Sequence, residues 1–213
     1  MTFKRYLRFR VDAVVVFNSY TAIPALQLVA KWAAKLKTLT FLKIADRHWD
    51  VHGLSLLHFL ISCTSIVHMA DLSMFPDESF DLVFNPCSNC FAPDVRAIWR
   101  ESARVLRHGG ILLTGFNNPV LYSVDQKLEA DGIVQLVHTI PYSDLTSRAP
   151  EDLKAQIAKD NLLEFGHTLA DQIGGQLDAG LVMTAMFEDN WGESHGVVDR
   201  LMDMFIATRA IKP

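Results

Sequence analysis

Glycine and glutamate are nearly absent from the first third of the chain. Residues 1–67 contain no Glu, and Gly53 is the only glycine before Gly109, where average usage of about 7% would place roughly seven. Charge is divided in the same way. Residues 1–67 hold nine Lys or Arg against three Asp, whereas residues 68–213 hold eleven against 21 Asp or Glu. The first third is therefore either a basic, helix-rich segment or, as we hypothesise, the product of a shifted reading frame.

Other scarcities exclude whole classes of protein. Three cysteines in 213 residues are too few for a disulfide framework. A net charge of −4 disfavours nucleic-acid binding driven by bulk positive charge. The longest apolar stretch, residues 54–66, is interrupted by polar residues and is shorter than the about 20 residues of a membrane-spanning helix. The basic start is followed by too short an apolar run for a secretion signal. We therefore expect a single cytoplasmic domain over residues 1–213 that binds neither nucleic acid nor membrane.

The middle of the chain follows a strand–helix–strand pattern. The apolar run Phe80–Phe84, bounded by polar turn residues, predicts a buried strand. Pro93 begins a helix that Gly109–Gly110 is expected to end, and Ile111–Thr114 follows as a second strand. The inward face of the helix carries apolar and small residues at helical spacing, namely Val95, Ile98, Trp99, Ser102 and Leu106. Such a unit is normally a crossover between parallel strands.

Weaker patterns lie on either side of this unit. Towards the N-terminus the sequence favours a strand, a helix and a strand at 13–17, 25–37 and 38–44. Towards the C-terminus it favours strands at 133–140, 181–187 and 205–211, helices at 150–159 and 168–177, and a helical turn at 199–204. We therefore predict an α/β fold with helices on both faces of a mostly parallel sheet, closed by an antiparallel C-terminal edge.

Two motifs at a fixed separation resemble those of a known enzyme family. The segments ADLSMFPDESFDLVF and RVLRHGG, in the stretch Met69–Pro119, resemble blocks of the class I S-adenosylmethionine-dependent methyltransferases, in the small-molecule branch called type 11. The resemblance covers about two thirds of the chain, from residue 69 onward. It implies a Rossmann-like fold, S-adenosyl-L-methionine as cofactor, and methyl transfer to a small-molecule acceptor.

The resemblance also implies where the ligands bind, since open α/β sheets bind them beyond the carboxyl ends of the strands. It assigns the methyl donor to the positions Met69, Ala70, Asp71, Leu72 and Asn85. It assigns the acceptor to Ser88, Asn89, Asn117, Tyr142 and His167. The sequence identifies no general base, no metal site and no oligomeric state.

The donor loop departs from the family pattern. The family has a glycine-rich turn after its first strand, which lets the backbone approach the cofactor, but the corresponding segment Asn18–Ala25 contains no glycine. Val67–His68 stand where the family has Gly-Asp, and only Asp46 is available as the acid that holds the ribose. We therefore separate an atypical part, 1–67, from a methyltransferase-like part, 69–213. The alternative function is a non-catalytic protein of the same fold that no longer binds the donor.

Cys87 and Cys90 form a C-x-x-C pair. Such a pair is typical of a thiol redox centre when a helix N-terminus lies beside it. As a zinc site it lacks a second pair, because only Cys63 remains. We favour ordinary residues of the cleft or core over either interpretation.

Overall fold

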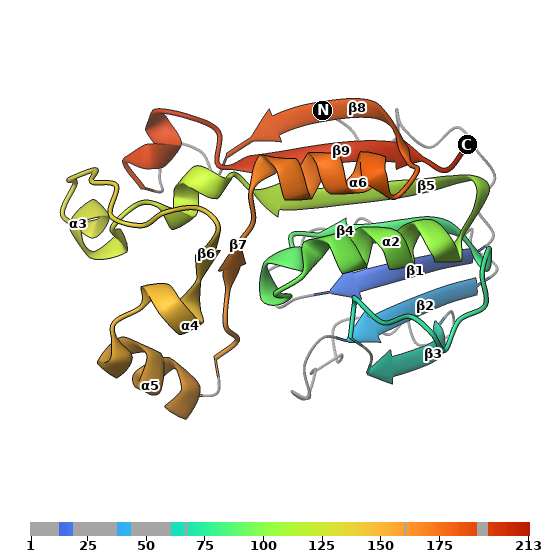
Figure 1. Ribbon diagram of the computed structural model, residues 1–213, viewed down its shortest axis with the longest axis horizontal. Helices are drawn as coiled ribbons and strands as arrows, with labels where there is room; N and C mark the ends of the chain where they lie inside the picture. Colours follow the sequence, from blue (N-terminus) through green and yellow to red (C-terminus); the bar gives the residue numbers. More distant parts are fainter. Residues whose placement is uncertain (1–12, 19–37, 44–60, 67, 160, 191–195) are drawn as a thin grey trace.

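The computed structural model describes residues 13–18, 38–43, 61–66, 68–159, 161–190 and 196–213. Its centre is a seven-stranded sheet with the strand order β3-β2-β1-β4-β5-β9-β8 (Figure 1). The strands are β1 (Ala13–Asn18), β2 (Thr38–Lys43), β3 (Ile61–Ile66), β4 (Phe80–Pro86), β5 (Leu106–Asn117), β8 (Val182–Asp189) and β9 (Phe205–Ile211). β1 to β5 pair in parallel, and β9 is antiparallel to both β5 and β8. The predicted mostly parallel α/β sheet with antiparallel pairing near the C-terminus is confirmed.

The N-terminal strands agree with the sequence pattern in part. β1 and β2 confirm the strands predicted at 13–17 and 38–44. β3 was not predicted, because its short sequence ISCTSI lies within a longer apolar stretch and has no turn residues to mark where a strand would begin. The helix predicted at 25–37, the loop after β1 and Asp46 lie outside the described residues.

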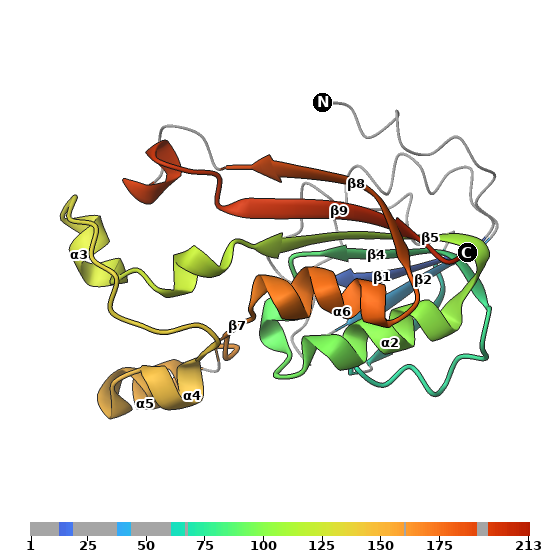
Figure 2. The same ribbon diagram turned by 45° about the horizontal axis from the view of Figure 1, so that its top comes forward.

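One face of the sheet is covered by α2 (Val95–Val105), the π-helical turn η5 (Ala170–Gly174) and α6 (Gly175–Asp178) (Figures 1 and 2). Asp94 caps α2 by accepting a hydrogen bond from the Ala97 N–H at 3.0 Å. The prediction that Gly109–Gly110 ends this helix is wrong. Leu106 already has an extended backbone and begins β5, where it pairs with Phe80. The Leu106 side chain is fully buried in the core between α2 and the sheet.

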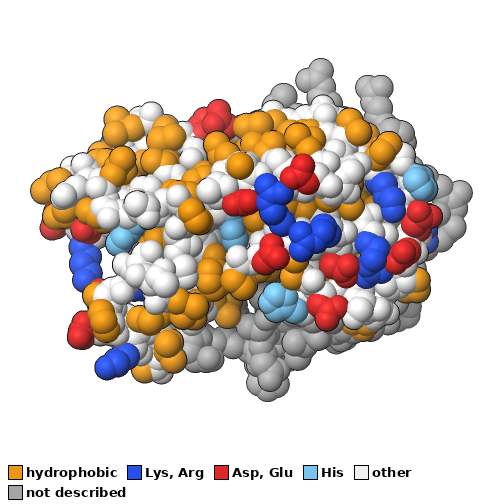
Figure 3. All heavy atoms as spheres, viewed as in Figure 1, with side chains coloured by type: hydrophobic (Ala, Val, Ile, Leu, Met, Phe, Trp, Pro, Cys, Tyr) orange, Lys and Arg blue, Asp and Glu red, His pale blue; other side chains and the backbone are white. Residues whose placement is uncertain are grey.

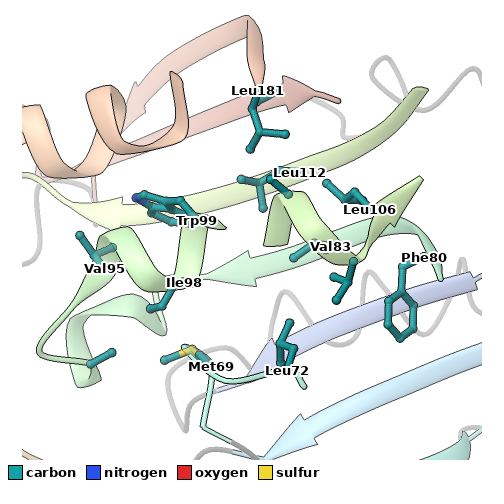
Figure 4. Packing of buried hydrophobic residues seen from close by; sticks show 14 residues of the cluster. Met69, Leu72, Phe80, Val83, Val95, Ile98, Trp99, Leu106, Leu112 and Leu181 are labelled. Atoms are coloured by element: carbon teal, nitrogen blue, oxygen red, sulfur yellow. The ribbon is translucent and has the colours of Figure 1, made fainter. Parts of the chain in front are cut away.

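The hydrophobic core lies between α2 and the sheet. Apolar side chains of β4, β5 and α2 meet there, and the segment that precedes β4 adds Met69 and Leu72 (Figure 4). Trp99 is fully buried at the centre of this cluster, and its Nε1–H donates to the Asp171 carbonyl at 3.1 Å. Each such side chain stabilises the fold by about 1.5–3 kcal/mol, so α2 and the segment around Met69 are held firmly against β4.

Residues 118–168, which we call the insert lobe, lie beyond the carboxyl ends of β4 and β5 (Figure 1). The lobe contains the elements η4 (Pro119–Tyr122), α3 (Gln126–Ala130), β6 (Tyr142–Ser143), α4 (Asp144–Ser147), α5 (Pro150–Ala158) and β7 (Phe165–Gly166). β6 and β7 form a separate antiparallel pair. The arrowheads of the parallel strands point toward this lobe, so it faces the edge of the sheet at which open α/β folds bind ligands.

The predictions for the C-terminal half are mostly confirmed. α5, the η5–α6 pair, β8 and β9 match the elements predicted at 150–159, 168–177, 181–187 and 205–211, and the short η6 (Val198–Arg200) lies near the predicted turn. The strand predicted at 133–140 is wrong. That segment makes one isolated bridge, Val124 to Leu136. Most of its apolar side chains are exposed, Leu136 at 63%, whereas Ile140 at its end packs against Tyr122 and Tyr142.

Candidate functional site

A tight polar turn follows β4 at the carboxyl edge of the sheet. Asn85 is fully buried, and its Oδ1 accepts the Ser88 N–H at 3.1 Å. Thr114 Oγ1 donates to the Asn85 carbonyl at 3.1 Å, and the Cys87 N–H donates to the Gly115 carbonyl at 2.9 Å. Cys87 has a positive φ of 57°, a conformation that costs a non-glycine residue about 1–3 kcal/mol and concentrates at functional sites. The turn is therefore fixed at both ends.

Two amide atoms in this turn are buried without a hydrogen-bond partner among the described residues. They are Nδ2 of Asn85 and Oδ1 of Asn89. The other end of the Asn89 amide is engaged, since its Nδ2 donates to Gln172 Oε1 at 2.8 Å. Leaving a buried polar atom unsatisfied costs about 1–3 kcal/mol. Buried polar groups nearly always have partners, so two exceptions in one turn call for an explanation such as a ligand.

The segment assigned to the methyl donor divides into buried and accessible positions. Met69 and Leu72 are at most 2% exposed and belong to the core. The Leu72 N–H donates to Glu101 Oε2 at 2.7 Å, and the Asp71 N–H donates to the His68 carbonyl at 2.9 Å. These backbone donors are thus engaged within the protein. Ala70 and Asp71 alone present side chains toward the surface, and hydrogen bonds from Ser73 lower the pKa of Asp71.

A hydrogen-bonded chain runs from the end of β5 into the insert lobe. Asn117 Nδ2 donates to Tyr122 Oη at 2.8 Å, and this hydroxyl donates to Glu164 Oε2 at 3.2 Å. Burial raises the pKa values of Tyr122 and Glu164. Sequence reasoning singled out Asn117 and missed the other two. Glu164 stands three residues before His167 in the same short segment, EFGH, but a lone Glu carries no motif.

Tyr142 joins this group from β6. Its ring is stacked on that of Tyr122, with centroids 5.4 Å apart, and its hydroxyl donates to Asp144 Oδ1 at 2.8 Å. The fully buried Asp144 also accepts from Arg148 Nε at 2.6 Å and from the Glu164 N–H at 2.9 Å. Burial opposes the ionisation of Asp144, but these donors outweigh it and its pKa is lowered. The carboxylate is therefore ionised and anchors the lobe.

His167 lies beneath the turn rather than on an open surface. It is 8% exposed, and its Nε2 is 3.3 Å from the Asn89 carbonyl oxygen. Burial lowers its pKa, which favours the neutral ring. This placement suits a residue that supports η3 (Asn89–Phe91), the short helix after β4.

The insert lobe contains a cavity of about 380 Å³ that is open to the surface on one side. The surface is hollowed there, between α3 and the α4–α5 pair (Figure 3). Aromatic walls come from Tyr122, Tyr142 and His138, and the lining includes four acidic side chains, Asp125, Asp144, Asp152 and Glu164, and two basic ones, Lys127 and Arg148. Glu164 is therefore shared by the cavity and the hydrogen-bonded chain that begins at Asn117.

The thiols of Cys87 and Cys90 are not set up for redox chemistry. Burial raises the pKa of Cys87 to about 11 and raises that of Cys90 as well, whereas a reactive thiol needs a lowered pKa. In the described part of the chain, no three His, Cys, Asp or Glu side chains gather as a metal site. No helix within those residues is long and apolar enough to cross a bilayer.

Residues 40–114 match the sequence model of a family described as methyltransferase domain. The chain is 43% identical over 144 residues to an uncharacterised methyltransferase, YbaJ, of Bacillus subtilis strain 168. The aligned region covers 68% of this chain. The chain spans 55% of the length of that relative. The family match begins well before Met69, so similarity extends upstream of the motifs that revealed it.

Solved structures share the architecture. An S-adenosylmethionine-dependent methyltransferase from Mesorhizobium loti aligns with a TM-score of 0.64 at 14% identity, covering 95% of this chain and 91% of that one. One from Methanosarcina mazei aligns with a TM-score of 0.57 at 14% identity, covering 98% and 95%. The chain has the class I methyltransferase fold. These comparisons confirm the resemblance to the methyltransferase family and the Rossmann-like architecture, both of which were inferred from the sequence.

Proposed function

We propose that the chain transfers a methyl group from S-adenosyl-L-methionine to a small-molecule acceptor. The turn after β4 is the observation that carries this proposal. It holds two buried, unpartnered amide atoms, on Asn85 and Asn89, at the carboxyl edge of a class I methyltransferase sheet. β4 lies between β1 and β5, so this turn borders the end of the first strand, where the family binds its donor.

The residues at this edge fit the donor in part. Asn85 offers an unused Nδ2–H₂ as a hydrogen-bond donor, and Asp71 offers an exposed, ionised carboxylate after β3. Ala70 adds little bulk beside it. Met69 and Leu72 support the segment from the core. We assign Asn85, Ala70 and Asp71 to the donor. We place Ser88, Asn89 and Asn117 where the acceptor meets the donor, at the carboxyl edge of the sheet.

For methyl transfer, the main task of the protein is to align the acceptor nucleophile with the methyl group of the donor. When bound, the donor supplies a methyl group already activated by its sulfonium centre. The chain must then hold the acceptor nucleophile about 3–3.5 Å from that carbon and in line with it. A turn fixed by Thr114 and by the Gly115 carbonyl provides a rigid frame for this task.

Calorimetric titration of the full chain with S-adenosyl-L-methionine tests the proposal. We expect saturable binding at micromolar levels. Asn85→Ala should weaken it at least tenfold, because the variant removes one polar contact to a charged ligand, worth about 1.5–3 kcal/mol. The matched control is Asn161→Ala, at an exposed position away from the edge, which should bind as the wild type does.

Two results of this titration would contradict the proposal or part of it. A chain that folds, as judged by circular dichroism and cooperative melting, yet takes up no S-adenosyl-L-methionine would overturn the proposal. Equal donor affinity in Asn85→Ala and the wild type would overturn the assignment of Asn85 alone.

A further inference from the structure

The charges that line the insert-lobe cavity do not balance. Both basic groups are already engaged, Arg148 by Asp144 at 2.6 Å and Lys127 by Asp152 at 3.0 Å. Two acids remain, Asp125 and Glu164, and neither forms an ion pair within the described residues. The cavity therefore presents a net negative wall that an organic cation would complement.

Glu164 is the acid whose surroundings best suit a ligand. It is partly buried and lines the cavity. Its backbone N–H donates to Asp144 Oδ2 at 2.9 Å. Its Oε2 accepts the Tyr122 hydroxyl, whereas its Oε1 has no partner among the residues described. A desolvated carboxylate with one free oxygen binds an ammonium group more strongly than an exposed one does.

The rest of the cavity suits the body of a small arylalkyl amine. Tyr142 and His138 meet edge to face at 5.3 Å, and Leu121, Val124 and Val137 add apolar surface. Tyrosine faces attract cations within about 6 Å. A volume of about 380 Å³ lies within the usual range for small-ligand sites.

The position of Glu164 is held rigidly. Its N–H donates to Asp144 Oδ2, and the next two residues form β7, in which Gly166 pairs with Tyr142 of β6. A Cβ on Gly166 would lie 2.6 Å from the Tyr122 ring, so the lobe is tightly closed there. Through Tyr122, the carboxylate is two hydrogen bonds from Asn117 at the carboxyl end of β5. The cavity is thus connected to the edge at which we place methyl transfer.

We propose, resting on the proposed methyltransferase function, that this cavity is the acceptor site, that the acceptor is a small organic amine, and that Glu164 holds its nitrogen. The ammonium group must lose one proton before its lone pair can attack, and the Glu164 carboxylate takes that proton. The new nitrogen–carbon bond forms as the sulfur–carbon bond of the donor breaks, and the electron pair of the broken bond stays on sulfur. The product is a methylated ammonium ion beside a neutral thioether.

The charged and titratable groups that face Glu164 are compatible with this role. Asp144 and Arg148 come from α4 and the residue after it, Tyr122 from η4, Tyr142 from β6, and Cys90 from η3. Asp144 and Arg148 neutralise each other. Burial therefore dominates at Glu164 and raises its pKa, which makes it a better proton acceptor than an exposed carboxylate.

The test is a titration of the full chain, without donor, with benzylamine and with its neutral analogue benzyl alcohol. We expect saturable binding of benzylamine and at least tenfold weaker binding of benzyl alcohol. Glu164→Gln should weaken benzylamine binding at least tenfold. Glu151→Gln makes the same change at an exposed position on α5 outside the cavity lining, and it should bind benzylamine within twofold of the wild type.

Three results would each overturn the inference: no saturable benzylamine binding by the folded wild type, equal binding of amine and alcohol, or unchanged binding in a folded Glu164→Gln. The amine–alcohol comparison uses the wild type alone, so it decides the matter even if the variant fails to fold. The donor titration is separate. Donor binding without amine selectivity would overturn the inference and leave the proposed function intact. Amine selectivity without donor binding would overturn the proposed function and with it the acceptor role of the cavity, which would then be an amine-binding site without methyl transfer.

Discussion

At the scale of single residues, Glu101 and Arg104 tie the segment before β4 to α2. Glu101 accepts the Leu72 N–H at 2.7 Å and pairs with Arg104 at 2.8 Å. Arg104 in turn donates to the carbonyls of Leu72 and Phe75. This part-buried pair binds the backbone of Leu72 and thereby fixes the position of the neighbouring accessible residues Ala70 and Asp71.

We predict that Glu101→Gln lowers the free energy of unfolding by about 1–2 kcal/mol. The variant keeps the shape of the side chain but loses the charge in three hydrogen bonds, one from the Leu72 N–H and two from Arg104. Each such bond is worth about 1.5–3 kcal/mol, and Gln retains part of that. Urea unfolding measures the change. Glu151→Gln, on an exposed face, is the control and should stay within about 0.5 kcal/mol of the wild type. A Glu101→Gln chain as stable as this control would contradict the prediction.

The contribution of Glu101 should also depend on pH. Hydrogen bonds from Arg104 lower its pKa in the folded state, below its unfolded value of about 4.3. The stabilisation is then fully present above about pH 4.3 and is lost as the pH falls through the lower, folded pKa. Urea unfolding at pH 7 and at successively lower pH should show the gap between wild type and Glu101→Gln closing. A gap that stays constant into acid would argue against an ionic origin.

At the scale of elements, α6 packs against α2 through a glycine. A Cβ built on Gly175 would lie 2.7 Å from Trp99 Cδ1, whereas on the adjacent Gly174 the nearest heavy atom is 4.0 Å away. Both glycines have ordinary helical backbone angles. The two positions therefore differ in contact and not in conformation.

We predict opposite effects of alanine at these two positions. Gly175→Ala should lower the melting temperature, because forcing a methyl group into a packed core costs about 1–3 kcal/mol, which outweighs a gain in helix propensity of about 1 kcal/mol. Gly174→Ala should raise or preserve it. Thermal unfolding of both variants, followed by circular dichroism, measures this. A Gly175→Ala chain at least as stable as Gly174→Ala would show that the two helices can separate without loss.

The sequence predicted well those elements whose apolar residues repeat at the regular spacing of a strand or a helix. β4, α2, α5 and β9 were found within a few residues. The early end of α2 was missed, because the pairing of Leu106 with Phe80 overrides the helix-ending signal of Gly109–Gly110. The segment 133–140 has a strand-like pattern but no partner strand, and such pairing is a long-range property. The cavity residue Glu164 was missed for the same reason, since its role depends on Tyr122, 42 residues away.

At the scale of the whole molecule, the insert lobe and the sheet are stabilised mainly by different groups. Asp144 collects hydrogen bonds from four residues of the lobe, Tyr142, Arg148, Gln156 and Glu164, whereas the sheet depends on the core around Trp99. Smaller clusters, such as Cys90 with Tyr122 and Tyr142, join the two. We therefore expect the lobe to open at a lower free energy than the sheet.

We predict that Asp144→Asn speeds amide hydrogen exchange in the lobe by on the order of a hundredfold, because breaking a buried ion pair costs about 3 kcal/mol. Exchange in β4, β5 and β9 should stay as slow as in the wild type. Asp152→Asn, which removes an exposed pair with Lys127, is the control and should change little. Equal acceleration in the lobe and the sheet would mean that the two unfold together.

The composition of residues 1–67 makes a prediction about the gene. Two observations count against replacement of the whole stretch, since β1, β2 and β3 take part in the sheet and the family match begins at residue 40. If a frame shift replaced this part, the upstream DNA read in another frame should encode a glycine-rich turn and end in Gly-Asp before Met69. Sequencing the gene and translating all three frames tests the hypothesis. If neither of the other two frames encodes the glycine-rich turn and the Gly-Asp pair, the hypothesis is wrong.

The position of β9 affects the order in which the molecule can be assembled. β9 separates β8 from β5, and within the described residues it is the strand with which β8 pairs. A ribosome releases β8 before β9, so the nascent chain carries an unpaired, partly apolar edge until residues 205–211 emerge. The sheet then gains two strands in one step. During synthesis, we expect a chaperone to protect this edge of the sheet until β9 is in place.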